Sequence, residues 1–283
     1  MVLATAVFVS NDTFMKLATE GLPPLQVLFM RGIAGTLWAL PLLFLTGAIR
    51  QIRLLADPWI LLRSAVETAV VCLFVICLAN MPIADITALG QLAPMMMLLG
   101  LALFFREPIR LNRLMLIAAG FAGAVLVAQP GAHGLSIFGI LGLIQAALTG
   151  LRDMLLRKVP AGSPSLIVAF STLIVVMIGA GAGHLVFERW ETPEVRHILL
   201  LAASGLCLMI AHVAISSAYR IGEAGVVAPF YYTYAIWAVI SGILVFNTVP
   251  VPMAVVGIVL ILASGVSVAL LDERKRRKLT VLA

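Results

Sequence analysis

Residues 82–108 read PIADITALGQLAPMMMLLGLALFFREP, and this stretch decides the fold. After Asp85 come about twenty apolar or small residues, enough for an α-helix to cross the hydrocarbon core of a bilayer. The run ends at the charged pair Arg106 and Glu107. Pro94 lies inside the run and frees a backbone carbonyl, which is tolerated where a neighbouring helix or a water-filled cavity can satisfy it. The stretch predicts a membrane helix with a polar end and with Pro94 at the edge of a cavity.

A second stretch repeats this plan in the other half of the chain. Residues 224–250, AGVVAPFYYTYAIWAVISGILVFNTVP, lead through small residues to Pro229, continue as an apolar run and end at Asn247 and Thr248. Two copies of one element imply an internally duplicated chain, as in many transporters. The apolar runs predict ten helices, at residues 2–18, 25–45, 60–80, 84–104, 112–129, 136–156, 165–186, 198–218, 225–246 and 252–271.

The composition is that of an integral membrane protein. Of the 283 residues, 62% are hydrophobic and 11% are charged, whereas a soluble domain is roughly half apolar and a quarter charged. The net charge of +6 does not predict nucleic-acid binding, because the basic residues lie between apolar segments and not on one soluble face. No cofactor and no metal are expected, since the sequence has no Walker motif and its four histidines lack metal-ligand spacing.

Lys and Arg residues predict how the chain is oriented. With both termini in the cytoplasm, the outer side keeps only Lys16, Arg189 and Arg196, and the inner loops collect most of the others, as the positive-inside rule requires. We therefore expect a multi-pass protein of the cell inner membrane, whose basic DERKRRK tail contacts lipid headgroups. No basic segment precedes the first apolar run, so no cleavable signal peptide is expected. The first helix looks short at its start, which suggests that upstream residues are missing.

An odd number of helices in each half forces the two halves into opposite orientations. The linker QPGAHGL carries the Pro and Gly residues that end a helix and separate the repeats. The predicted fold is an all-α membrane protein with ten transmembrane helices, arranged as two inverted five-helix repeats around a midplane site. The repeats span residues 1–130 and 136–271, and a basic cytoplasmic tail spans 272–283.

Several phrases carry a resemblance to a known family. NDTFMKLA closes the first helix, VLFMRGIAG opens the second, ANMPIADITALGQLAP leads to Pro94, and the stretch from AYRIGEAG to FNTVP covers the ninth. In this order and spacing they resemble the drug/metabolite transporter superfamily, in its two-repeat EamA-type branch. The resemblance implies a secondary transporter in which helices one to four and six to nine surround a cavity. Thr248 and Tyr231 stand where many relatives have acidic residues, so a mechanism that uses those carboxylates is not expected.

Charged residues inside helices are the first candidates for function, because each costs about 2.5–3.5 kcal/mol to insert. Asp12 precedes Lys16 by four residues, a spacing that allows an ion pair on one helix face. Either this pair fixes the depth of the first helix, or Asn11 and Asp12 contact the substrate or a coupling proton. Arg31 lies a third of the way into the second helix. Its side chain either snorkels to the interface or lies in the cavity as a counter-ion, where it would pair with Asp12 or Asp85.

Glu67 follows Arg63 by four residues, so it either forms a local ion pair or exchanges a proton with the cavity. Gln91 and Gln145 either form helix–helix hydrogen bonds or contact the substrate from a second tier. Arg152 and Asp153 come near the inner end of the sixth helix, where Asp153 can reach Arg157. We expect these last residues to form a gate or an anchor and not a binding site.

An aromatic group follows the Pro of the ninth helix, and comprises Pro229, Phe230, Tyr231, Tyr232, Tyr234 and Trp237. Helical spacing places Phe230, Tyr234 and Trp237 on one face and the other two tyrosines off it. These residues either pack in the ordinary way or form an aromatic wall for a planar or amphipathic solute. In the second case the methionines at 95–97 would lie across the cavity from them.

These features predict a secondary carrier that moves a small organic metabolite by alternating access, with protons or a counter-substrate as the coupled species. Few charges together with Tyr, Trp, Met and Gln favour a neutral or zwitterionic solute such as an amino acid. The alternative is import of a planar vitamin such as riboflavin. A membrane-embedded enzyme and a passive channel are the other classes, but the sequence shows neither a catalytic constellation nor a filter motif. Glycines on the fifth and tenth helices offer a surface for a homodimer.

Overall fold

The computed structural model describes residues 1–105, 111–128, 136–160, 162–221 and 227–282. All regular elements in these ranges are helices, which confirms the all-α prediction. Within the described residues, seven helical segments are long and apolar enough to cross a membrane, and two shorter apolar helices accompany them. The first five helices are α1 (Val2–Ala18), α2 (Pro24–Leu45), α3 (Pro58–Asn80), α4 (Ile83–Gly90) and α5 (Ala93–Phe105). They are followed by α6 (Leu111–Ala128), α7 (Ile137–Leu155), α8 (Ser165–Phe187), α9 (Val195–Ile221), α11 (Thr233–Phe246) and α12 (Pro252–Leu282), with 3-10 turns η1 (Ala48–Ala56), η2 (Leu156–Lys158) and η3 (Ala228–Tyr232) between them.

The helix expected at 84–104 is two helices, α4 and α5, separated by a turn at Gln91 and Leu92. Pro94 is the physical reason, because a proline in the middle of a helix removes a hydrogen bond and clashes with the carbonyl four residues earlier, here that of Gly90. In the first turn of α5 the proline ring meets no such conflict. Pro94 therefore does not bend a continuous helix, and its side chain is exposed.

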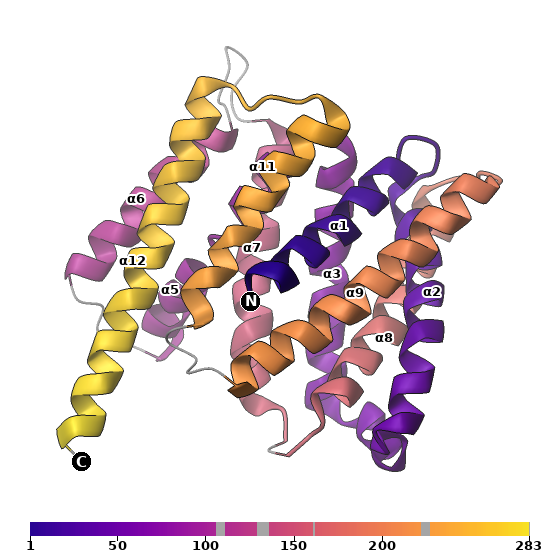
Figure 1. The fold of residues 1–283 in the computed structure, drawn as a ribbon, viewed down its shortest axis with the longest axis horizontal. Helices are drawn as coiled ribbons and strands as arrows, with labels where there is room; N and C mark the ends of the chain where they lie inside the picture. Colours follow the sequence, from indigo (N-terminus) through magenta and orange to yellow (C-terminus); the bar gives the residue numbers. More distant parts are fainter. Residues whose placement is uncertain (106–110, 129–135, 161, 222–226, 283) are drawn as a thin grey trace.

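Helices α6 and α12 lie side by side at one edge of the bundle, and α2 and α8 lie at the opposite edge (Figure 1). Gly123 and Gly257 allow the first pair to approach closely, since a Cβ atom on Gly257 would lie 2.5 Å from the Gly123 carbonyl oxygen. Gly265 likewise faces the Tyr232 ring. These glycines are used for packing within the chain, so they do not form the free homodimer surface expected from the sequence.

The start of α2 is held by the connection between α8 and α9. Pro23 and Pro24 begin the helix without a side-chain cap of its own. Glu188 takes that role from outside, accepting hydrogen bonds from the backbone N–H groups of Leu25 at 3.0 Å and Gln26 at 3.2 Å. A carboxylate at this end satisfies free donors and complements the helix dipole. This contact fixes α2 against the second half of the chain.

Candidate functional site

Asp12 is the most buried carboxylate of the first half. It is 2% exposed, and it accepts hydrogen bonds from the Asn11 side chain at 2.8 Å and from the Tyr234 hydroxyl. Asn11 in turn accepts a bond of 2.8 Å from the Ser204 hydroxyl. Helix α1 is thereby tied to α9 and α11, both from the second half of the chain. The structure thus brings Asn11, Asp12 and Tyr234 together, whereas Ser204 gave no signal in the sequence.

Lys16 does not pair with Asp12, as the i, i+4 spacing allowed. Its ammonium group donates to the carbonyl oxygens of Leu78 at 2.5 Å and Met81 at 2.7 Å. These carbonyls belong to the end of α3, where the helix leaves acceptors unsatisfied. The Lys16 charge also acts on Asp85, which is 6% exposed and has one carboxylate oxygen without a partner in the described ranges.

Arg31 lies in α2 and is 6% exposed, so it does not reach the interface by snorkelling. The guanidinium interacts electrostatically with Asp12 and Glu67. The predicted direct pair with Asp12 or Asp85 is not formed in the described part of the chain, where Asp12 accepts from Asn11 and Tyr234 instead. The Nε atom of Arg31 is buried and has no hydrogen-bond partner among the residues that the structure describes.

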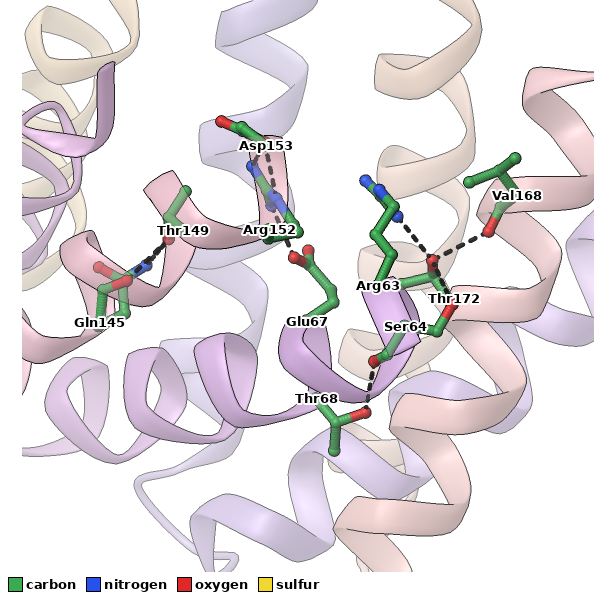
Figure 2. A network of polar contacts seen from close by, with 10 residues as sticks. All are labelled: Arg63, Ser64, Glu67, Thr68, Gln145, Thr149, Arg152, Asp153, Val168 and Thr172. Atoms are coloured by element: carbon green, nitrogen blue, oxygen red, sulfur yellow. Dashed lines mark hydrogen bonds and ion pairs between the residues drawn. The ribbon is translucent and has the colours of Figure 1, made fainter. Parts of the chain in front are cut away.

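Glu67 and Arg152 form an ion pair of 2.7 Å between α3 and α7 (Figure 2). Arg152 also bonds Asp153 at 2.8 Å, so its guanidinium bridges two carboxylates. The expected local pair of Arg63 with Glu67 is replaced: Arg63 donates to the Thr172 hydroxyl on α8 at 3.1 Å. Figure 2 shows Arg152 between Asp153 and Glu67, with Arg63 turned toward Thr172. Arg152 and Asp153 therefore belong to the network around Glu67 and are not a separate anchor.

Gln145 and Gln91 lie close to the break between α4 and α5. The Gln145 amide donates to Thr149 of its own helix at 3.2 Å, while its buried side-chain oxygen has no partner in the described part of the chain. A Cβ atom on Gly90 would lie 3.8 Å from that oxygen, which places Gln145 beside the end of α4. Gln91 is 4% exposed. Both amides are placed to form hydrogen bonds with a polar solute at this break.

The aromatic residues of η3 and α11 do not share the faces predicted for one regular helix. Phe230 is 49% exposed and Tyr234 is 8% exposed, because the chain passes from a 3-10 turn into an α-helix between them. The rings of Tyr231 and Tyr234 stack at a centroid distance of 6.0 Å. The Trp237 indole donates to the Val2 carbonyl at 3.2 Å. Tyr234 and Trp237 thus contact α1, and the Pro229 side chain lies outside the described ones.

Tyr232 and Met95 pack against glycines of neighbouring helices. Tyr232 is 8% exposed and faces Gly265 of α12. Met95 is fully buried and faces Gly120 of α6. The expected row of methionines at 95–97 across from the tyrosines is therefore wrong for Met95.

His212 is a residue that sequence reasoning missed. Its Nδ1 atom lies 2.8 Å from the Leu208 carbonyl oxygen, so that nitrogen carries the proton and donates. The ring lies 5.7 Å from that of Phe8, and the side chain is exposed. It interacts electrostatically with Glu67, Arg31 and Arg63. His212 therefore belongs to the same polar centre, and no group of three metal-ligating side chains occurs in the described ranges.

Three carboxylates and three guanidinium groups make up this polar centre, so the formal charges balance when His212 is neutral. The contacts join α1 to α9 and α11, and α3 to α7 and α8. Charges in a membrane protein of this kind face the interior of the bundle or a water-filled cavity. The arrangement can bind a polar solute by hydrogen bonds and charge. Its members are Asp12, Arg31, Arg63, Glu67, Arg152, Asp153 and His212.

Residues 1–129 match the EamA-like transporter family. The riboflavin transporter of Vibrio cholerae is 26% identical over 261 residues, which cover 91% of this chain and 87% of that protein. The pseudopaline exporter of Pseudomonas aeruginosa is 24% identical over 270 residues, covering 95% and 94%. One solved crystal structure superposes with a TM-score of 0.62 at 17% identity over 96% of both chains, and therefore shares the fold.

A helical membrane protein with this match and these relatives is a small-molecule transporter. Residues 1–129 carry an EamA-like transporter domain, and the resemblance to the drug/metabolite transporter superfamily is confirmed. Since the family and the relatives are transporters, the alternative of a membrane-embedded enzyme is set aside.

Proposed function

We propose that the chain is a secondary active transporter, which moves a small organic metabolite across the cell inner membrane by alternating access. The observation that carries the proposal is the set of buried polar contacts between the two halves of the chain. Asp12 of α1 meets Tyr234 of α11, and Glu67 of α3 meets Arg152 of α7. Contacts of this kind can break and re-form as the halves rock against each other around a central site.

We propose ten transmembrane helices in two inverted repeats, at residues 1–130 and 136–271, with α4 and α5 together as one span and η3 with α11 as another. The helix pairing supports this plan. Helix α1 packs on α9 and α11, and α7 packs on α3 and α5 in the corresponding way. Helix α2 packs on α8, and α6 on α12, so exchanging the halves leaves the pairing unchanged. The Lys and Arg distribution favours cytoplasmic termini and a cytoplasmic tail at 272–283.

Asp12, Glu67 and Asp85 are the proposed sites for a coupled proton or for a group of the counter-substrate. Each lies on a membrane helix and none is fully exposed. Asp85 keeps a buried oxygen without a partner, and Asp12 is held by neutral donors only. A carboxylate without a direct cationic partner is the group that protonation in a bilayer relieves most. Asn11, Arg31, Gln91, Gln145 and the tyrosines of η3 and α11 are the proposed substrate contacts.

The balanced charge of the polar centre favours a neutral or zwitterionic substrate such as an amino acid, because such a solute adds no net charge to a buried site. A planar vitamin such as riboflavin is the second candidate. The stacked rings of Tyr231 and Tyr234 and the names of two relatives favour it.

Counterflow tests the proposal. Purified protein is placed in liposomes preloaded with a pooled mixture of amino acids, related metabolites and riboflavin, with and without a pH gradient. We expect one chemical class to exchange in a saturable way that protein-free liposomes do not show. Exchange that never saturates would support a passive channel instead. No exchange by folded protein would overturn the carrier assignment.

A further inference from the structure

The guanidinium of Arg31 lacks the partner that a buried cation requires. The side chain is 94% buried, and its Nε atom has no hydrogen-bond partner. No ion pair joins it to a carboxylate of the described residues within 4 Å, although Asp12 and Glu67 interact with it over a longer range. A buried charge without a direct partner is costly unless the site has a purpose for it.

The carboxylates of Asp12 and Glu67 accept hydrogen bonds from groups other than Arg31. Asp12 accepts bonds from Asn11 and Tyr234, and Glu67 accepts a bond of 2.7 Å from Arg152. Neither carboxylate bonds Arg31 directly in this conformation. The Nε–H group of Arg31 is therefore left without an acceptor among the described residues.

Arg63 also has a buried donor without a partner among the described residues. Its Nη1 atom donates to Thr172, but its Nε atom is buried without a partner. Arg63 and Arg31 both interact electrostatically with Glu67, and His212 interacts with both arginines. Arg31 is buried and Arg63 only partly, so the cost of the missing partner is larger at Arg31.

A guanidinium edge offers two parallel N–H groups, which match the two oxygens of a carboxylate. We propose that Arg31 anchors an oxyanion subsite of the transport site and that the substrate carries a free carboxylate there. This inference rests on the proposed function and narrows it. A zwitterion keeps the centre neutral, whereas a phosphate dianion would add two negative charges beside Asp12 and Glu67. Amides, amines and a vitamin without a carboxylate lack the group that Arg31 requires.

Thermal unfolding of the purified protein in detergent tests the ligand class. The probes are matched sets built on several amino acids, each as the zwitterion, the N-acetyl acid, the amide and the amine, together with riboflavin and inorganic phosphate. We expect at least one set in which the free acids raise the midpoint by about 5 °C or more near 100 Kd and the amide and amine do not. Equal shifts by acid and amide, or no shift in any set, would overturn the subsite. An equal shift by phosphate would overturn the carboxylate assignment.

Variants test the residue. Because Arg31 lacks a partner, Arg31→Gln should leave the midpoint of the empty protein unchanged or higher and abolish the shift with acids, while Arg31→Lys keeps part of it. Arg152→Gln is the matched control, since it removes a paired arginine and should lower the midpoint. If Arg31→Gln lowers the unfolding midpoint as much as Arg152→Gln does, Arg31 has a structural role and the subsite is refuted. Counterflow separates the two proposals. Exchange of solutes that have no carboxylate would overturn the carboxylate subsite alone. Binding of acids without any exchange would overturn the transporter function alone.

Discussion

Replacing Glu67 or Arg152 tests whether the ion pair between α3 and α7 holds the halves together. The side chains are 16% and 21% exposed, so the pair is mostly buried. Breaking a buried pair typically costs about 3–5 kcal/mol, because one charge is left uncompensated. The remaining exposure places Arg152→Gln at the low end, about 3 kcal/mol. That loss corresponds to a fall of about 6–12 °C in the unfolding midpoint at a fixed scan rate.

The structure also predicts the order of the effects. Glu67→Gln leaves Arg152 bound to Asp153 at 2.8 Å, whereas Arg152→Gln leaves both Glu67 and Asp153 without a cation. Arg152→Gln should therefore be the more damaging change, and the double variant should fall less than the sum of the singles. Arg196→Gln is the control, because its 3.9 Å pair with Glu20 is exposed and should be worth at most about 1 kcal/mol. Single variants that behave like this control, or a strictly additive double variant, would refute the reasoning.

Three further predictions concern packing, capping and coupling. Gly257→Ala should cost about 1–3 kcal/mol of stability, measured by thermal unfolding, because its Cβ would meet the Gly123 carbonyl oxygen at 2.5 Å and backbone cannot give way cheaply. Glu188→Ala should lose about 1 kcal/mol with the cap of α2, whereas Glu191→Ala should not, since only the backbone of Glu191 bonds to α2; equal midpoints would contradict this. Glu67→Gln should alter the dependence of counterflow on a pH gradient, and unchanged dependence would remove Glu67 from coupling.

Helix positions follow well from the sequence where a long apolar run meets a polar end. The run at 165–186, for example, corresponds to α8 at Ser165–Phe187. In a bilayer the backbone must satisfy its own hydrogen bonds, so an apolar run of this length has little choice but to form a helix. Prolines are less informative, because the same residue can bend a helix or start a new one. Pro94 starts α5, and neighbouring helices decide such a choice.

Candidate charges could also be predicted, but their partners could not. Asp12, Arg31 and Glu67 stand out because a charge within an apolar run is costly. The expected i, i+4 pairs with Lys16 and Arg63 are replaced by contacts with groups on other helices. An i, i+4 pair contributes only about 0.2–0.5 kcal/mol, so such a contact can easily outweigh it. The groups that replaced them include the Tyr234 hydroxyl and the Arg152 guanidinium, more than eighty positions away. Hydroxyl groups such as that of Ser204 are ordinary in membrane helices, so nothing in the sequence marks one as a partner.

Two of the crossings between the halves differ in their polar contacts, and this difference bears on how a carrier of this kind would work. At the crossing of α1 and α9, Asn11 and Ser204 meet through a neutral hydrogen bond of 2.8 Å. At the crossing of α3 and α7, Glu67 and Arg152 meet through an ion pair of 2.7 Å. A neutral bond contributes about 1 kcal/mol net, and a charge-assisted one roughly twice that. If access alternates, one crossing must open while the other holds. By these two bonds alone the α1–α9 contact is the weaker one, but the bond from Tyr234 to Asp12 must break as well before that carboxylate can meet water or solute from that side.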